Sequence, residues 1–260
     1  MKEFVKNYWK SLLFFALVGL VGGFFTGLFL LDSYPAEIRQ ELVAELTTAG
    51  LGQFPVEPIV AIITAVQSAF YGVALGAAGI WLGKKTGLWK DERTLSPKPL
   101  VITALVSLAG GLMMILPDVL FFGRYSQAVL DSYATKPSIV FILASVTYGA
   151  VIEEVMLRLF WMSLAVFLLH KLVGRGSDRP SVAVMVFANV ITAILFAAGH
   201  LPATILLLGD SPMILLRCFL LNGGLGLAFG WLYRKYGLRY AMIAHGGCHV
   251  VSKLIWILFL

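Results

Sequence analysis

The feature that most constrains this chain is a series of long apolar runs that carry few or no charges. A helix needs about 20 consecutive apolar residues to cross the hydrocarbon core of a bilayer. We therefore expect an all-α, polytopic membrane protein with about seven transmembrane helices, or eight, forming a single integral membrane domain over residues 1–260. The seven runs are Ser11–Leu31, Pro58–Gly83, Pro99–Pro117, Pro137–Leu169, Pro180–Gly209, Ser211–Tyr233 and Tyr240–Leu260.

The composition agrees with this fold class. Hydrophobic residues make up 59% of the chain and charged residues 13%. Soluble domains have roughly 45–50% apolar and about 25% charged residues. This balance excludes a soluble enzyme, a disordered chain and a nucleic-acid-binding domain, although the net charge is +6.

Basic residues between the runs are distributed unevenly. Only three of them, Arg39, Arg124 and Lys136, lie in the loops after the first, third and fifth runs. Because cytoplasmic loops are enriched in Lys and Arg, we predict a cytoplasmic N-terminus and a non-cytoplasmic C-terminus in the cell membrane, with the lipid bilayer as a partner and no nucleic acid. The fourteen basic residues at the other ends are Lys2, Lys6, Lys10, Lys84, Lys85, Lys90, Arg93, Lys98, Lys171, Arg175, Arg179, Arg234, Lys235 and Arg239.

Two patterns predict packing rather than chemistry. In Pro35–Thr48, three glutamates and three apolar residues each repeat every four positions, which predicts an amphipathic helix at the outer interface. Gly19, Gly23 and Gly27 in the first run form a small-xxx-small face that favours close helix packing.

Five charged side chains fall inside apolar runs: Glu153, Glu154, Arg158, Arg217 and Lys253. One charge at the bilayer centre costs roughly 2.5–3.5 kcal/mol on insertion scales, so such residues usually pair or function. Glu154 and Arg158 have the spacing of a helical ion pair. Glu153 points about 100° away on an α-helix and is left as a candidate general base. The alternative is one buried ion network that only holds helices together.

Three of the four histidines also lie in the later runs. His200 precedes Leu201-Pro202, while His245 and His249 are four residues apart, and Lys253 continues their stripe. The His-x-x-x-His spacing suits two ligands of one zinc ion. A lone histidine in an apolar helix is more often a hydrogen-bonding partner in packing.

These residues belong to motifs that resemble a known family. Residues 153–158 fit EExxxR, residues 196–200 fit FxxxH, and Gly226–Tyr233 leads to the helix that carries His245. In this order the motifs resemble the CPBP (Abi) family, whose best-known members are the type II CAAX prenyl endopeptidases. The resemblance covers residues 137–252, which we take as the catalytic core.

The resemblance implies an intramembrane endopeptidase with a glutamate-activated water. It assigns activation of the water to Glu153, positioning of the water to His200 and stabilisation of the oxyanion to His245. Glu154 and Arg158 would support the site.

One position departs from the family pattern. His249 stands where the family usually has asparagine, and a histidine can still donate a hydrogen bond to an oxyanion. It can also bind metal. We expect no cofactor, and the alternative is a zinc site formed by His200, His245, His249 and Glu153.

The implied substrate is a lipidated or membrane-associated peptide or protein, for example a prenylated CAAX protein that loses its C-terminal tripeptide. The alternatives are a catalytically inactive scaffold or bacteriocin-immunity protein, and a proton- or ion-coupled transporter. Counting along the helices at 1.5 Å per residue puts His245 about 9 Å and Glu153 about 26 Å from the cytoplasmic edge. We therefore expect the fourth helix to project into the cytoplasm and the site to open from that side. The alternative is a tall cavity in which the fifth and seventh helices are broken.

Overall fold

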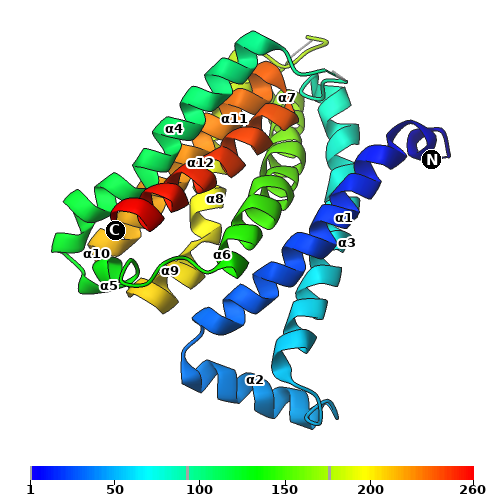
Figure 1. Cartoon of the computed structure of the whole chain (residues 1–260). Helices are drawn as coiled ribbons and strands as arrows, with labels where there is room; N and C mark the ends of the chain where they lie inside the picture. Colours follow the sequence, from blue (N-terminus) through cyan, green and yellow to red (C-terminus); the bar gives the residue numbers. More distant parts are fainter. Residues whose placement is uncertain (1, 92–93, 175–176) are drawn as a thin grey trace.

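The computed structural model describes residues 2–91, 94–174 and 177–260, so Arg93 and Arg175 lie outside the described residues. The described chain is helical and contains no strand (Figure 1). Seven of its helical segments are long and apolar enough to cross a membrane, which confirms the expected fold class. They are Lys6–Ser33, Val56–Thr86, Pro97–Arg124, Ile139–Val173, Val182–Leu208, Pro212–Tyr236 and Leu238–Phe259.

Several of these spans are interrupted by short changes of helix type. The elements are α1 (Lys2–Ser33), α2 (Ala36–Thr48), α3 (Val56–Thr86), α4 (Pro97–Leu120), the 3-10 turn η1 (Phe122–Arg124), α5 (Gln127–Asp131), α6 (Ile139–Ala144), the π-helices η2 (Ser145–Glu153) and η3 (Val155–Met162), α7 (Ser163–Val173), α8 (Val182–Gly199), α9 (Leu201–Leu208), α10 (Pro212–Cys218), the π-helix η4 (Phe219–Gly223), α11 (Gly224–Tyr236) and α12 (Leu238–Phe259).

The first and second spans, α1 and α3, pack closely along their glycines. A Cβ atom at Gly23 would lie 2.5 Å from the carbonyl oxygen of Thr64, and one at Gly27 would lie 2.7 Å from Cα of Ala61. Neither distance is possible for a real side chain, so only glycine allows this approach. The small-xxx-small face therefore packs as predicted.

Between these two spans, α2 forms the helix expected from the repeated glutamates. It has no buried residue and crosses the end of the α1–α3 pair (Figure 1). Arg39 of α2 reaches Glu57 of α3 at 3.5 Å. The helix is confirmed, and its place at the outer interface stays a prediction.

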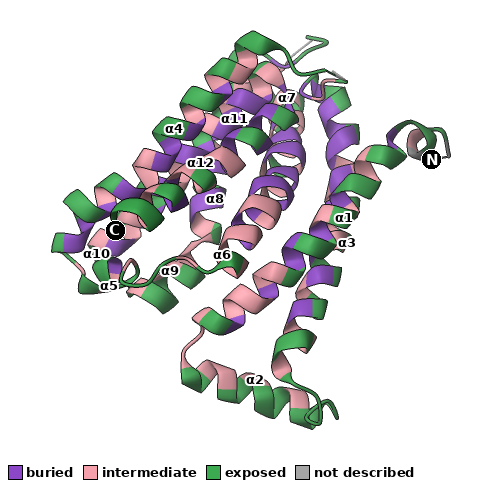
Figure 2. Ribbon diagram, in the orientation of Figure 1, coloured by how far each residue is buried: buried purple, intermediate pink, exposed green. Residues whose placement is uncertain are grey.

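The fourth span runs through the middle of the bundle. Val155, Leu159 and Met162 of η3 have no exposed surface, and buried residues concentrate on the central helices (Figure 2). This span has 35 residues, against 22 in the last span. The fifth span breaks at His200, between α8 and α9, whereas α12 is continuous. The sequence placed His245 and Glu153 at different depths in the membrane. The length of the fourth span and the break in the fifth span are the features of the structure that bear on this difference.

Candidate active site

The two adjacent glutamates lie at a junction between two π-helices. Glu153 is the last residue of η2, and Glu154 separates η2 from η3. A π-helix is rare and is found frequently at functional sites. The α-helix assumed from the sequence is therefore wrong for this part of the span, and the angle of about 100° between the glutamates is only approximate.

The ion pair expected from the spacing is present. Arg158 donates from Nη1 to Oε1 of Glu154 at 2.9 Å, and both side chains are buried. Its Nη2 donates to the carbonyl oxygen of Gly226 at 3.1 Å. The guanidinium also lies over the rings of Phe196 and Phe229, at 4.6 Å and 5.4 Å from their centroids. The arginine is thus held from three different helices.

Glu154 has a second partner that the sequence did not indicate. Its Oε1 lies 2.9 Å from Nδ1 of His245, which is 91 residues away in the chain. Because a carboxylate only accepts hydrogen bonds, the proton of this contact sits on Nδ1. The His245 ring also stacks on Phe229, with centroids 4.6 Å apart. The ring is therefore fixed in orientation and tautomer, and its Nε2 is left for other contacts.

Glu153 differs from its neighbour in exposure and bonding. Its side chain is 21% exposed, whereas that of Glu154 is fully buried. Oε2 of Glu153 lies 3.9 Å from Nε2 of His245, which is longer than a hydrogen bond. Within the described chain, no hydrogen bond engages the Glu153 carboxylate. It is therefore the carboxylate of this centre that remains available to accept a proton.

His249 lies beside His245 and faces the same helix. The two rings stack with centroids 5.0 Å apart. A Cβ atom at Gly149 would lie 3.3 Å from Nε2 of His249 and 3.8 Å from Nε2 of His245. Gly149 is one turn before Glu153 on the same helix. Because glycine has no side chain, Nε2 of His245 and Nε2 of His249 can both face this helix, which carries the Glu153 carboxylate.

Lys253 binds the opposite side of the His249 ring. Its Nζ lies 3.3 Å from Nδ1 of His249 and 4.2 Å from the centroid of Phe141. An ammonium group can only donate. When Lys253 is charged, Nδ1 of His249 therefore accepts and Nε2 carries the proton, directed toward Gly149.

His200 occupies the break in the fifth span. Its Nδ1 donates to the carbonyl oxygen of Phe196 at 2.8 Å, so Nε2 is again the free ring nitrogen. The Phe196 ring lies edge-on to both His200 and His245, with centroids 4.7 Å and 6.0 Å away. The structure thus brings Glu153, His245 and His249 together, and His200 lies close enough to His249 to interact with it electrostatically.

The glycine-rich motif of the sixth span supports this centre. A Cβ atom at Gly226 would lie 3.1 Å from Cα of Ala193, so α8 approaches its backbone closely. Two members of the motif, Gly226 and Phe229, touch Arg158, and Phe229 also holds His245. The sequence pattern alone assigned no role to either residue. Their position in the motif, on the helix before His245, was the available signal.

The zinc site of His200, His245, His249 and Glu153 stays an alternative prediction. In the part of the chain that the structure describes, no group of three or more His, Cys, Asp or Glu side chains has a geometry that could hold a metal ion. One nitrogen of each histidine is already directed to another partner, namely Glu154, Lys253 or the Phe196 carbonyl.

The fold and this centre define a class: a multi-pass helical membrane protein with a glutamate, arginine and histidine cluster buried between its spans. Residues 135–251 match the family model described as type II CAAX prenyl endopeptidase Rce1-like. The match covers 117 of the 260 residues and falls on the stretch whose motifs predicted this family. The family is one of membrane proteases, which implies a peptidase with a membrane-associated substrate. Neither a curated protein nor a solved structure matches the chain.

Proposed function

We propose that this protein is an intramembrane endopeptidase in which Glu153 activates the attacking water. The observation that carries the proposal is the difference between the two glutamates. Glu154 is buried and bound to Arg158 and His245, whereas Glu153 is partly exposed and 3.9 Å from Nε2 of His245. A general base must be reachable by water and must not be occupied by another cation.

In the proposed reaction, Glu153 takes a proton from water while the water oxygen bonds to the peptide carbonyl carbon. The carbonyl oxygen becomes an oxyanion, which needs hydrogen-bond donors already in place. Nε2 of His249 is one donor when Lys253 occupies Nδ1. Nε2 of His245 is a second donor when both ring nitrogens carry a proton, with Nδ1 donating to Glu154. The peptide C–N bond then breaks, and the proton on Glu153 passes to the leaving amine.

His200 has a separate part in this scheme. Its Nδ1 is bound to a backbone carbonyl, so Nε2 can accept a hydrogen bond from the water and orient it. We propose that this chemistry needs no metal ion. The substrate class is a peptide held at the membrane by a lipid or an apolar segment, and removal of the C-terminal tripeptide of a prenylated CAAX protein is one reaction of that class. The N-terminus is cytoplasmic in this proposal, and the C-terminus is not.

The test is cleavage of a farnesylated fluorogenic peptide by purified protein in detergent. Glu153→Gln removes the base but keeps the side-chain shape, so kcat should fall by about 10²–10⁴-fold while the midpoint of thermal unfolding stays unchanged. Glu41→Gln, an exposed glutamate on α2, is the matched control and should cleave normally. Undiminished cleavage by Glu153→Gln refutes the role of Glu153. Failure of the folded wild-type protein to cleave refutes the proposed activity on this peptide class.

Metal removal tests the remaining alternative. Cleavage should survive treatment with EDTA and with 1,10-phenanthroline followed by dialysis. Loss of cleavage that added zinc restores would overturn the metal-independent mechanism.

A further inference from the structure

A large cavity of about 760 Å³ lies at one end of the bundle. Its wall comes from the ends of α1, α4 and α12, from α9 and η4, and from the segment between α5 and α6. In Figure 1 these elements surround the C-terminus and lie away from the N-terminus. Polar members of the wall include Asp131, Lys136, His200, Arg217, Asn222 and Lys253.

The large cavity reaches the catalytic centre at two points. His200 and Lys253 both belong to its wall. Nζ of Lys253 is 3.3 Å from His249, and the Phe196 ring joins His200 to His245. Glu153, His245 and His249 are not among the residues of this wall, so a peptide in the cavity would come within one side chain of the proposed reaction centre.

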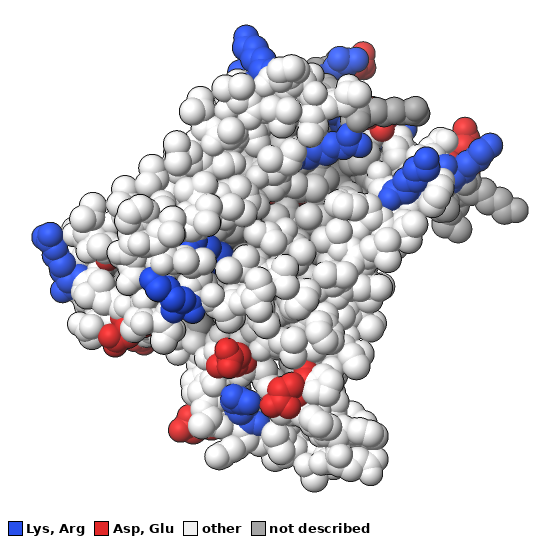
Figure 3. All heavy atoms as spheres, in the orientation of Figure 1, with Lys and Arg blue, Asp and Glu red and all other residues white. Residues whose placement is uncertain are grey.

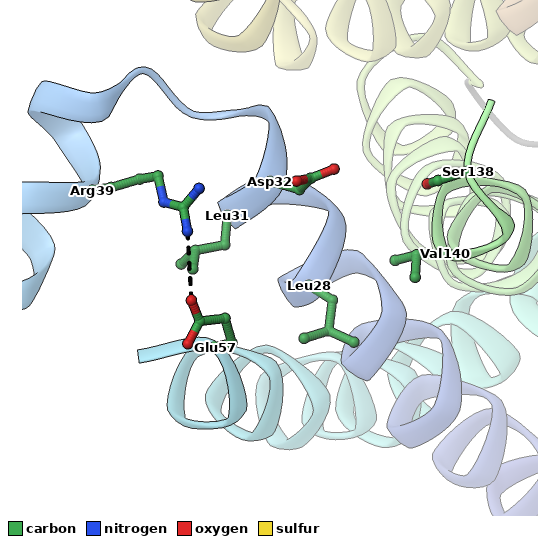
Figure 4. Close-up of a pocket in the computed structure, with 7 residues that line it drawn as sticks. All are labelled: Leu28, Leu31, Asp32, Arg39, Glu57, Ser138 and Val140. Atoms are coloured by element: carbon green, nitrogen blue, oxygen red, sulfur yellow. Dashed lines mark hydrogen bonds and ion pairs between the residues drawn. The ribbon is translucent and has the colours of Figure 1, made fainter. Parts of the chain in front are cut away.

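A smaller cavity of about 410 Å³ adjoins the large one. The two cavities share Asp32 and Ser138 in their walls. Figure 4 shows this place, where the end of α1 and the start of α3 meet α2 and the start of α6. Leu28 and Val140 line it between α1 and α6, which gives the region an apolar side next to its polar groups. Such a side suits the membrane anchor of a substrate.

The charge distribution identifies the membrane face to which this end belongs. The end with the cavities carries three of the basic residues outside the apolar runs and seven exposed acids: Asp32, Glu37, Glu41, Glu45, Glu57, Asp131 and Asp210. The opposite end, formed by the start of α1 and the loops after α3, α7 and α11, carries the other basic residues of the described chain that lie outside the runs. Figure 3 shows acidic side chains gathered near α2 and basic ones near the N-terminus. Lys and Arg concentrate on the cytoplasmic side, so both cavities lie at the non-cytoplasmic end.

We propose that the peptide to be cleaved reaches the centre from the non-cytoplasmic face, through the large cavity. The inference rests on the proposed function and narrows its substrate to membrane-anchored peptides exposed on that face. It replaces the expectation, drawn from helix lengths, of a site open to the cytoplasm. A prenylated protein anchored at the cytoplasmic face would meet the basic end of the bundle, away from both cavities.

The first experiment locates the opening of the cavity. Ala203 is exposed and lies in the cavity wall, and replacing it by cysteine is a conservative change. Both native cysteines are buried. A membrane-impermeant methanethiosulfonate should modify Ala203→Cys in right-side-out vesicles and reduce cleavage at least tenfold. The matched control Ser177→Cys, in the loop after α7, should react only in inverted vesicles. Modification of Ala203→Cys in inverted vesicles only would overturn the proposal.

The second experiment follows cleavage itself. The farnesylated fluorogenic peptide, made with charged residues so that it cannot cross the bilayer, is added outside sealed vesicles. Right-side-out vesicles should cleave it at least tenfold faster than inverted vesicles, and detergent should make the two rates equal. Faster cleavage by inverted vesicles overturns the inference about the face. No cleavage after detergent addition instead counts against the proposed function, so the two failures are distinguishable.

Discussion

Two arginine–carboxylate pairs lie inside the bundle and differ in how completely their atoms are bonded. In each pair the carboxylate side chain has no exposed surface. Glu154 and Arg158 join neighbouring turns of one span, whereas Asp118 and Arg217 join the ends of α4 and α10. Burying two charges costs several kcal/mol per ion before their attraction compensates. The same chemistry thus occurs twice, and the difference between the pairs is the reason for assigning only the inner one to the proposed catalytic centre.

The Asp118 pair is closed. Nε and Nη2 of Arg217 each donate to one carboxylate oxygen, and the Tyr133 hydroxyl donates to Oδ2 at 2.8 Å. Burial first, and the Asp118 carboxylate next, raise the pKa of Tyr133, so the phenol stays a donor at neutral pH. Both oxygens are bonded, and the pair fixes the segment before α6 over the large cavity.

The Glu154 pair is open. Its Oε1 binds Arg158 and His245, while Oε2 is buried without a hydrogen-bond partner in the described chain. Glu153, beside it, is not hydrogen-bonded, and Nε2 of His245 is left facing Glu153. A buried ion pair that uses all its oxygens is a structural contact, whereas unsatisfied polar atoms at a buried pair point to function.

The largest effects should come from neutralising each acid in turn. Glu154→Gln and Asp118→Asn both leave a buried arginine without its counter-ion, so each should lower the free energy of unfolding by about 3–5 kcal/mol. Only Glu154→Gln should also lower kcat, by about 100-fold or more, because a neutral amide holds the His245 ring less strongly than the carboxylate does. Thermal unfolding and kcat per folded molecule, measured on the same preparations, check both parts.

The comparison fails if Asp118→Asn lowers kcat as strongly as Glu154→Gln while the protein remains folded. In that case the outer pair would contribute directly to the reaction. It also fails if Glu154→Gln cleaves normally, because the Glu154–His245 contact would then have no part in the reaction.

The sequence predicted features that follow from local spacing. Bilayer thickness translates directly into run length, so the seven spans could be counted from the lengths of the apolar runs alone. The Glu154–Arg158 pair followed from a spacing of four residues. The packing of Gly23 and Gly27 followed from a repeat of four on one helix face.

The sequence could not predict features that depend on contacts between distant spans. Glu154 and His245 are 91 residues apart, and Asp118 and Arg217 are 99 apart. No local pattern indicates which buried acid meets which cation or histidine of another span. The π-helical geometry around Glu153 was missed for a related reason, because apolar periodicity in a buried span does not distinguish α from π turns.

Replacing whole pairs by apolar residues gives an intermediate effect and sharpens the contrast. Asp118→Leu with Arg217→Met should leave the free energy of unfolding unchanged or raise it by about 1–4 kcal/mol, because no uncompensated charge remains. Tyr133 keeps an acceptor in the Met114 carbonyl, so kcat should persist, and any change should fall on KM because Arg217 lines the large cavity. Glu154→Leu with Arg158→Met should be inactive and less stable than the first double variant, because Nδ1 of His245 and the Gly226 carbonyl lose their partners. Retained cleavage by the second double variant would show that the inner pair is only structural.

The smallest effect concerns Lys253, whose contact with the centre, among the described residues, is the one with His249. Lys253→Met should lower kcat about tenfold, or about 1.4 kcal/mol, because Nδ1 of His249 loses its donor and the proton is no longer held on Nε2. His249→Asn supplies an amide donor that has no tautomers. We therefore expect His249→Asn to cleave and Lys253→Met to have no further effect in that background.

A double-mutant cycle measures this coupling, with thermal unfolding of all four proteins as the control for packing. Equal losses from Lys253→Met in the wild-type and His249→Asn backgrounds would mean that Lys253 acts on the substrate or on stability. An effect seen only with histidine present identifies Lys253 as a positioning residue. The centre around Glu154 would then differ from the Asp118 pair in a further way. Lys253, which is not part of the Glu154–Arg158 pair, would keep the proton of His249 on Nε2.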